Sequence, residues 1–600
     1  MELKKISICP QERGIVKRIF RDTMIVQTLS ATMPVISLVV DGAVTGSLLG
    51  TTELAAYGLA TPLLLTVTAL SNAAGNGLST VLGKDIGKGD IKGAEKHMFS
   101  SIAVFTVIFV LAVLLVFLAA RPIARLLGAS GEMLDLTAQY LRGYAPAIPP
   151  LIVIMMLLPV MQIDGNRQHV FKTMAVMTAV NIGSDFLNVY VLRWGLMGMA
   201  LATTYSHYAA LIAALLHFLH PNGMLRLRAS SIDFACVRDV IRYGLPGALY
   251  MEGRSFLAMF TNWLLLKVAG TSAIAISAAI IATYNFGMCA GNGIGAAVTL
   301  LTGMYSGEKD REALQTVVDT GVRYSVAVNT VISVLLIVFS RPIMTLYIHD
   351  PSISLETAAL CLRILTPAII LDSIHATFRN YFQAMSISVI TYPYAILDSF
   401  ICNAAAAYIL GHMFGLYGVW IGMVSGRLVT LLIMTIMIRF RSDRNKHFRE
   451  AFFMLSQEYY ADTTQATFII HHPHEVQEAS GKVQRFMCEH GSLPATALKL
   501  SIAVEELANN IVKYGFRDKR RHIIEVRVTA SSGCWILRMA DDCGLFDPPG
   551  YLKNFHPDDT YLHIGIRMVS SLVDDMQYMS TFKTNNTILK ISDRSVRNSY

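Results

Sequence analysis

Long apolar stretches separated by short polar loops make up the chain as far as about residue 440. About 20 helical residues suffice to cross a bilayer, and twelve stretches reach that length. They cover residues 23–50, 54–82, 98–120, 134–161, 170–192, 195–219, 239–268, 272–303, 319–340, 355–383, 388–411 and 415–439. From Arg441 onward charged residues are frequent and no apolar run of 18 residues occurs. The pattern predicts an all-α polytopic membrane part of twelve helices, followed by a soluble domain.

The charge of the polar loops predicts the orientation of the membrane part. Most Lys and Arg residues lie in alternate loops, at 83–97, 164–172, 220–242 and 306–312. Because cytoplasmic loops carry the excess of basic residues, we expect a multi-pass protein of the bacterial cytoplasmic (inner) membrane with both termini in the cytoplasm. Residues 1–22 are basic and show no cleavage site after a short apolar core, so they are interpreted as a cytoplasmic arm.

The composition narrows the class of protein further. Of 600 residues, 53% are hydrophobic and 15% charged, an apolar share above that of soluble proteins. The formal charge of +8 lies in loops at membrane ends, where membrane lipid is the expected partner and nucleic acid is not. Eight cysteines show no CxxC pair and no metal-ligand spacing, which favours a reduced, zinc-free tail.

The two halves of the membrane part share short motifs at a constant offset. Gly83, Gly87 and Asp90 recur 220 positions later in the loop GMYSGEKD, and Arg121-Pro122-Ile123 recurs at the same offset. Composition alone rarely produces such a repeat, so the sequence predicts two parallel six-helix lobes. A transporter built this way holds its site between the lobes, near the membrane midplane.

Acidic residues inside the spans mark the candidate site. Asp41 is the only formal charge in 23–49, and Asn181 and Asp185 share one face of the fifth span at i and i+4. An intramembrane carboxylate costs at least roughly 2.5 kcal/mol, so it is expected to face a wet cavity or a cation. Two carboxylates in one pocket do not both ionise easily. A structural polar pair between helices is the alternative interpretation of Asn181 and Asp185.

The membrane part resembles the multidrug and toxic compound extrusion (MATE) transporters. The resemblance covers about residues 15–440 and lies in the pattern VVDGAVTGSLLG, the Gly-rich second and eighth spans, and GLMGMALAT in the sixth. Members are antiporters that expel organic cations or drugs against H⁺ or Na⁺, so the resemblance implies that activity and coupling ion. It also implies a proton- or cation-binding cluster like that of the DinF-like branch, at Asp41, Asn181, Asp185 and Thr203.

The second lobe offers a further pair of acids. Glu252 and Asp372 resemble the glutamate and aspartate with which other MATE branches bind their coupling ion. Arg254, His375 and Arg379 lie nearby in sequence, so structural ion pairing is an equal alternative. Oxygen ligands suit Na⁺ as well as a shuttling proton, and the residues do not choose between the two ions.

The tail shows a different pattern, alternating strands with amphipathic helices. It predicts an α+β domain in which helices cover one side of a sheet. Its motifs resemble the GHKL fold, the histidine kinase-like ATP-binding fold, and within it the anti-sigma-factor-type serine kinases. EELANNIVKYG, MADDCGLFDPPG, HIGIRMVSSLVDD and NNT carry the resemblance.

That resemblance implies a role for each motif. Glu506 orients or deprotonates an attacking hydroxyl, and Asn510 holds Mg²⁺ on the phosphates of ATP. Asp542 and Gly544 contact the adenine, Gly565 presents a helix start to phosphate, and Thr587 reaches the adenine side. Departures at Tyr514, His563 and Asn585 put hydrolysis or transfer in doubt more than binding. Enzymatic activity of the tail, as serine kinase or ATPase, stays an open question.

The domain organisation follows from these patterns. It comprises a basic arm (1–22), an N-terminal lobe (23–220), a C-terminal lobe (221–440), a linker (441–465) and a GHKL-type sandwich domain (466–600). The leading hypothesis is a cation-coupled antiporter that exports organic cations or drugs and carries a regulatory ATP-binding tail. One alternative is a signalling protein whose tail phosphorylates a serine on an anti-sigma-antagonist-like partner. The other is a flippase for lipid-linked sugars, against which the intramembrane acids argue.

Overall fold

A computed structural model describes residues 14–219, 224–227, 231–348, 354–442, 451–456, 459, 465–516, 522–531, 533–553, 564–582 and 584–593. The chain divides into two compact units. Residues 20–162 and 167–454 form the helical membrane unit, and residues 455–600, with 1–19 and 163–166, form the other. The tail therefore begins near the predicted linker, most of which lies outside the described residues.

The N-terminal lobe consists of helices that follow the predicted spans, and helix α1 extends into the predicted basic arm by beginning at Gly14. Its helices are α1 (Gly14–Val44), α2 (Thr51–Lys88), α3 (Ile91–Leu118), α4 (Ala120–Leu126), α5 (Glu132–Tyr144), α6 (Ile148–Ile163), α7 (Arg167–Leu187) and α8 (Gly195–Leu215).

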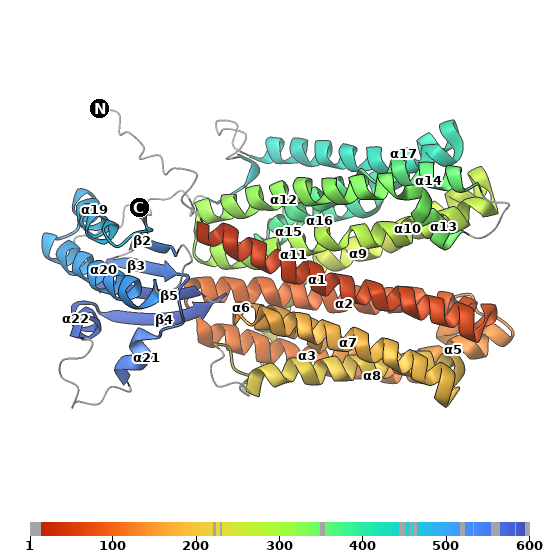
Figure 1. The fold of residues 1–600 in the computed structure, drawn as a ribbon, viewed down its shortest axis with the longest axis horizontal. Helices are drawn as coiled ribbons and strands as arrows, with labels where there is room; N and C mark the ends of the chain where they lie inside the picture. The colour runs from red at the N-terminus through yellow and green to blue at the C-terminus, as the bar shows by residue number, and fades with distance from the viewer. Residues whose placement is uncertain are drawn as a thin grey trace. The chain divides into compact units, whose positions relative to one another are not determined.

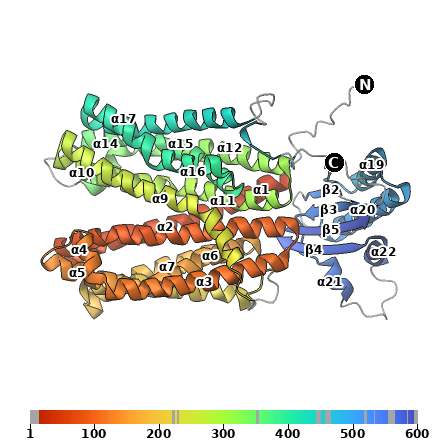
Figure 2. The same cartoon turned by 180° about the vertical axis from the view of Figure 1, so that it is seen from behind.

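The C-terminal lobe repeats this plan. Its helices are α9 (Phe234–Ala269), α10 (Thr271–Gly287), α11 (Cys289–Gly307), α12 (Arg311–Val338), α13 (Ser340–Tyr347), α14 (Leu355–Leu365), α15 (Ala368–Ala384), α16 (Ser388–Ile396) and α17 (Cys402–Arg441). The two lobes lie side by side as bundles of roughly parallel helices (Figures 1 and 2). The predicted all-α polytopic fold is confirmed.

The described helices account for all twelve predicted spans. In the part of the chain that the structure describes, nine helical segments are long and apolar enough to cross a membrane, or ten if the bent pair α10 and α11 is one span. The segment Ser388–Arg441 holds two predicted spans, divided at Gly415, whose φ of 61° interrupts the helix. Helix α9, with 36 residues and several charges, is the remaining one.

The repeated motifs have a structural explanation at the helix starts. Asp90 accepts a hydrogen bond from Gly93 N at 2.8 Å and begins α3, while Asp310 accepts one from Ala313 N at 3.0 Å and begins α12. Both are N-caps, which satisfy amide groups that a helix start leaves without partners. The repeat thus preserves the chemistry that starts equivalent helices.

The repeated glycines lie at the contact between the lobes. A Cβ on Gly87 would overlap the backbone of α11 at Met304 and Gly307, and one on Gly307 would overlap the backbone of α2 at Lys84. Gly244 of α9 meets Ala73 of α2 in the same way. Only glycine allows backbones to approach this closely. Gly87 and Gly307 lie at the helix ends next to the basic loops 83–97 and 306–312, which the charge pattern assigns to the cytoplasmic side.

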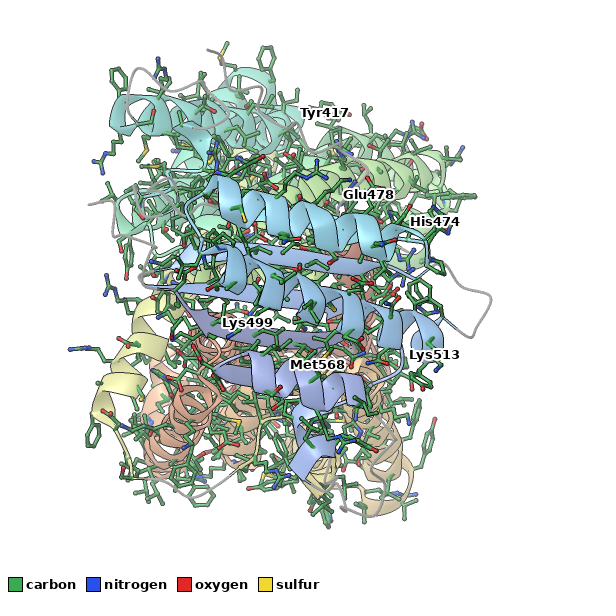
Figure 3. The ribbon with its side chains drawn as sticks, turned by 90° about the vertical axis from the view of Figure 1, so that its left-hand side faces the viewer. Tyr417, His474, Glu478, Lys499, Lys513 and Met568 are labelled. Atoms are coloured by element: carbon green, nitrogen blue, oxygen red, sulfur yellow. The ribbon has the colours of Figure 1, made fainter. Side chains whose placement is uncertain are left out.

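The tail is a five-stranded antiparallel sheet covered on one face by helices. The sheet order is β1-β2-β3-β5-β4. Figure 3 shows α19, α20 and α22 lying over the strands, with Glu478 on α19, Lys499 and Lys513 on α20, and Met568 on α22. The elements are β1 (Gln465–Ile470), α19 (Glu475–Glu489), α20 (Pro494–Gly515), β2 (Ile524–Ser531), β3 (Cys534–Asp541), α21 (Pro548–Lys553), α22 (Ile564–Leu572), β4 (Asp575–Thr581) and β5 (Thr584–Ser592).

Apolar side chains at alternate positions of the strands form the core of the tail together with the helices. Leu537 and Met539 of β3 and Leu589 of β5 are buried with Leu500 and Val504 of α20. Side chains at i and i+2 of a strand share one face, so these residues continue toward the strand ends as a single line facing the helices. The predicted α+β fold is confirmed.

Substitution of Gly307 tests the lobe contact. We expect Gly307→Ala to lower the melting temperature of the purified full-length protein by several degrees, because the added methyl group meets backbone and overpacking costs about 1–3 kcal/mol. Gly183→Ala is the matched control, since nothing lies within 4 Å of a Cβ there. Equal melting temperatures for the two variants would contradict the close approach.

Candidate cation site and candidate nucleotide site

Two intramembrane carboxylates lie together in the N-terminal lobe. Asp41 of α1 lies beside Asp185 and Asn181 of α7. Asp185 and Asn181 are buried, with 0% and 3% of their surfaces exposed. The structure therefore brings together three of the four residues predicted for the cation-binding cluster.

The polar atoms of this cluster face one another and find no partner elsewhere in the described protein. One oxygen of Asp41, both oxygens of Asp185 and the amide nitrogen of Asn181 are buried without a hydrogen bond from outside the cluster. No described Lys, Arg or His forms an ion pair with either carboxylate. A buried charge without a partner costs several kcal/mol, so the pair requires a bound proton or metal cation. The donor set, oxygen from carboxylate and amide, suits either H⁺ or Na⁺.

Two tyrosines that sequence reasoning missed lie close to the acid pair. Tyr57 of α2 and Tyr140 of α5 are near enough to Asp41 and Asp185 to interact electrostatically with both. Their rings meet edge to face with centroids 5.4 Å apart. Aromatic rings attract organic cations, so the site combines negative charge with π faces. No spacing in the sequence indicates this, because the tyrosines come from different helices.

Two other polar residues of these spans have local partners. The Thr203 hydroxyl donates to the Met199 carbonyl of its own helix at 3.4 Å, and no described hydrogen bond joins it to the acid pair. Asn188 accepts from Trp194 N at 3.1 Å and donates to the Gly195 carbonyl at 2.9 Å. Asn188 therefore stabilises the turn between α7 and α8, while the cation-binding role of Thr203 stays a prediction.

The acids of the C-terminal lobe have different surroundings. Asp372 of α15 accepts from Arg427 Nη2 at 3.1 Å and from Arg254 Nη1 at 3.3 Å, and the Tyr284 hydroxyl also donates to it. Glu252, on α9, is partly exposed and forms no ion pair with a described residue. The structure does not join the two acids in one unpaired cluster. Asp372 fits the structural ion pairing considered above, and the coupling-ion role of both acids stays a prediction.

In the tail, the structure brings three predicted nucleotide-site residues together. A Cβ on Gly565, at the start of α22, would collide with Glu506 Oε2 and lie 3.6 Å from Asn510 Nδ2. Glu506 and Asn510 stand one turn apart on α20. Carboxylate, amide and the amide groups of a helix start therefore share one place, where anionic phosphate and Mg²⁺ fit.

The end of strand β3 presents two adjacent aspartates with different surroundings. Asp541 pairs with Asn585 in the register of β3 and β5, two residues along from the pair Met539 and Thr587, so all four lie on the helix-covered face. Asp542 follows the strand, and its Oδ1 accepts from Ile523 N at 3.0 Å and from His522 Nδ1 at 3.2 Å. Adenine binding by Asp542 stays a prediction, and Asp541 is a second candidate that the strand alternation Leu537, Met539, Asp541 could have revealed.

Asn585 organises the loop that follows these aspartates. Its Nδ2 donates to Asp541 Oδ1 at 2.8 Å and to the Gly544 carbonyl at 3.0 Å, and its Oδ1 accepts from Phe546 N at 3.0 Å. Burial raises the pKa of the Asp541 carboxyl, while hydrogen bonds from Asn585 and Cys543 act against that shift. The departure from glycine at 585 thus positions both Gly544 and Asp541.

A cluster of three residues beside the nucleotide site carries side chains of the metal-ligating kind. In the described part of the chain, His522, Asp542 and Cys543 are the one His/Cys/Asp/Glu group whose ligand atoms lie within 4.8 Å of one another. His522 already contacts Asp542 and stacks on Phe516 with centroids 5.2 Å apart. This arrangement is explained by packing beside the nucleotide site.

Two related helical lobes and an α+β tail define a polytopic membrane protein of the transporter class with a fused soluble domain. The MatE family matches residues 28–187 and 246–409, more than half of the chain. The chain therefore belongs to the MATE family. Residues 471–591 match the histidine kinase-like ATPase domain. Both resemblances drawn from the sequence motifs are confirmed.

Known relatives and solved structures agree with this assignment. The chain is 22% identical over 385 residues to the probable multidrug resistance protein NorM of Thermotoga maritima, with 61% of this chain and 80% of that protein covered. It is 24% identical over 402 residues to the multidrug export protein MepA of Staphylococcus aureus, covering 65% and 86%. An outward-facing MATE multidrug transporter structure superposes with a TM-score of 0.68 at 22% identity, covering 72% of this chain and 96% of that one.

The adjacent aspartates of the tail can be distinguished by nucleotide binding. We expect Asp541→Asn to weaken binding of a fluorescent ATP analogue to the full-length protein at least tenfold, since a hydrogen bond to a charged group contributes about 1.5–3 kcal/mol. Asp542→Asn should change the affinity less than threefold, because that carboxylate is held by His522 and Ile523. The reverse order would restore Asp542 as the adenine-binding residue.

Proposed function

We propose that this protein is a cation-coupled antiporter that exports organic cations or drugs, with the acid pair of the N-terminal lobe as its exchange site. The observation that carries the proposal is the pair of half-buried Asp41 and fully buried Asp185, which lie side by side without a basic partner in the described chain. Its similarity to a multidrug resistance protein and a multidrug export protein supports an efflux role.

The chemistry of the acid pair supplies the coupling. In one state Asp41 and Asp185 hold H⁺ or Na⁺, which neutralises their mutual repulsion. In the other state the carboxylates are free to attract an organic cation, whose charge they balance while Tyr57 and Tyr140 contact its apolar part. Ion and substrate are antagonists at one site, and their differential affinity for two arrangements of the lobes drives exchange.

The close contact of the lobes provides the element that changes between states. Gly87 and Gly307 pack backbone to backbone at the end of the bundle that carries the basic loops. With those loops in the cytoplasm, this contact closes the cytoplasmic side of the inner membrane in the arrangement described here. Separation of α2 from α11 opens that side, and the acid pair then faces the cytoplasm.

The tail is proposed to bind ATP with Mg²⁺ and to regulate transport. Asn510 holds the metal and the start of α22 at Gly565 binds phosphate, while Asp541 or Asp542 with Thr587 recognises the adenine. ATP supplies a transferable phosphoryl group when bound. Glu506 lies against Gly565, where it can accept the proton of an attacking hydroxyl.

A second function is favoured by that position of Glu506. A base held beside the phosphate-binding helix start is the arrangement needed for transfer to a serine hydroxyl of a partner protein similar to an anti-sigma-factor antagonist. The membrane unit would then sense a ligand rather than export one.

Mutation of one residue in each unit separates these functions. We expect Asp185→Asn to abolish gradient-driven dye efflux from proteoliposomes containing the full-length protein, because the amide cannot exchange a proton or bind Na⁺ as a charge. Asn510→Ala should leave basal efflux intact. Glu132→Gln, an exposed acid at the start of α5, is the matched control and should be unchanged. No efflux by wild type, together with phosphorylation of a partner serine that is lost in Asn510→Ala, would favour the signalling function.

A further inference from the structure

We propose that Arg254 forms an anion-binding site in the C-terminal lobe and receives the carboxylate of a substrate that also carries a positive charge. This inference rests on the proposed export function and specifies its substrate class. The N-terminal lobe would then bind the cationic part of the substrate and the C-terminal lobe its anionic part.

One group of charged residues in contact inside the C-terminal lobe holds more arginines than aspartates. Three arginines, Arg254, Arg379 and Arg427, face two aspartates, Asp372 and Asp398, within one connected set of contacts. These five side chains together carry one surplus positive charge. An uncompensated charge inside a membrane protein is costly and marks a functional site by default.

Each aspartate is already satisfied by an arginine other than Arg254. Asp398 accepts from Arg379 Nη1 at 2.6 Å and lies 3.4 Å from His375 Nδ1. Both oxygens of Asp372 are engaged by Arg427. These contacts are buried, since the side chains of Arg427 and Arg379 are 3% and 9% exposed. These two buried ion pairs lie beside Arg254.

Arg254 is the third arginine of the set, and it belongs to neither of these two ion pairs. Its one hydrogen bond to a described residue runs from Nη1 to Asp372 Oδ2, at 3.3 Å. A guanidinium has five N–H donors in a planar fork, so most of its donors are available. Its side chain is 28% exposed, far more than the other two. No ion pair joins it to Glu252, two residues away on the same helix.

The shape of the available group favours a carboxylate. Arginine forms paired, parallel hydrogen bonds with a carboxylate, and Asp372 holds the guanidinium by one edge. The buried Tyr284 ring lies 5.9 Å from the Arg254 guanidinium and helps to hold its position. Asp41 and Asp185 of the N-terminal lobe attract a cationic group. A molecule that carries one positive and one negative charge can therefore bind to both lobes.

A pair of rhodamine dyes tests this inference. The two dyes differ only in whether the benzoate is free or methyl-esterified, so one is zwitterionic and the other cationic. Binding to the purified full-length protein in detergent is followed by fluorescence polarisation. We expect wild type to bind the free-acid dye more tightly, and Arg254→Gln to weaken that dye at least tenfold and the ester less than twofold. Arg254→Lys should give an intermediate loss, because it keeps the charge but not the fork.

An exposed arginine of the same lobe provides the control. Arg341→Gln, with a side chain 69% exposed on α13, should change neither dye. Equal losses for both dyes in Arg254→Gln, or no loss for either, would overturn the inference, as would a wild type without preference for the free acid. A free-acid signal displaced by phosphatidylglycerol and not by benzoate would assign Arg254 to a lipid headgroup and also overturn it.

Failure of the inference is distinct from failure of the proposed function. The ester dye has no carboxylate, so its efflux depends on Asp185 and not on Arg254. Efflux of the ester that survives in Arg254→Gln but not in Asp185→Asn would support the antiporter whatever the free-acid dye does. Ester efflux that is insensitive to Asp185→Asn would refute the antiporter itself.

Discussion

The free energy of charge in a low-dielectric lobe is the constraint on which this structure depends. A charged side chain removed from water must acquire a partner or bind an ion. The C-terminal lobe satisfies Asp372 and Asp398 internally with arginines, whereas the N-terminal lobe leaves Asp41 and Asp185 without any described basic partner. The same physical cost therefore yields a rigid ion-paired interior in one lobe and an ion-binding site in the other.

This asymmetry arises within a symmetric framework. The lobes share their helix starts at Asp90 and Asp310 and their glycine contacts at Gly87 and Gly307, which are backbone features. Their interiors differ in the partners of the charged side chains: Asp185 of the fifth span has no described basic partner, whereas Asp398 of the equivalent eleventh span pairs with Arg379. Duplication thus supplied two similar bodies able to move against each other, and divergence of a few buried side chains gave each lobe its own chemistry.

The tail uses a different principle to position its polar residues. Strand alternation places Leu537, Met539 and Asp541 on one face, so the row of core side chains ends in a carboxylate at the end of the central strand β3. Asn585 on the neighbouring strand holds that carboxylate and the carbonyl of Gly544. The approach of Glu506 to Gly565 joins α20 to the start of α22. The candidate nucleotide site is therefore an extension of the core rather than a separate loop structure.

Periodicity and composition determined the fold class, the helical spans, the two lobes and the α+β tail, because these depend on local patterns of apolar and polar residues. The sequence also singled out Asp41 and Asp185, since an acid in an apolar span is conspicuous by itself, and the resemblance to the MATE family grouped them with Asn181 and Thr203. It could not identify Tyr57 and Tyr140, the engagement of Asp372 by Arg427, or the different surroundings of Asp541 and Asp542. Those depend on which side chains from distant segments meet, and only the tertiary structure decides which buried charge is paired and which is left to bind something else.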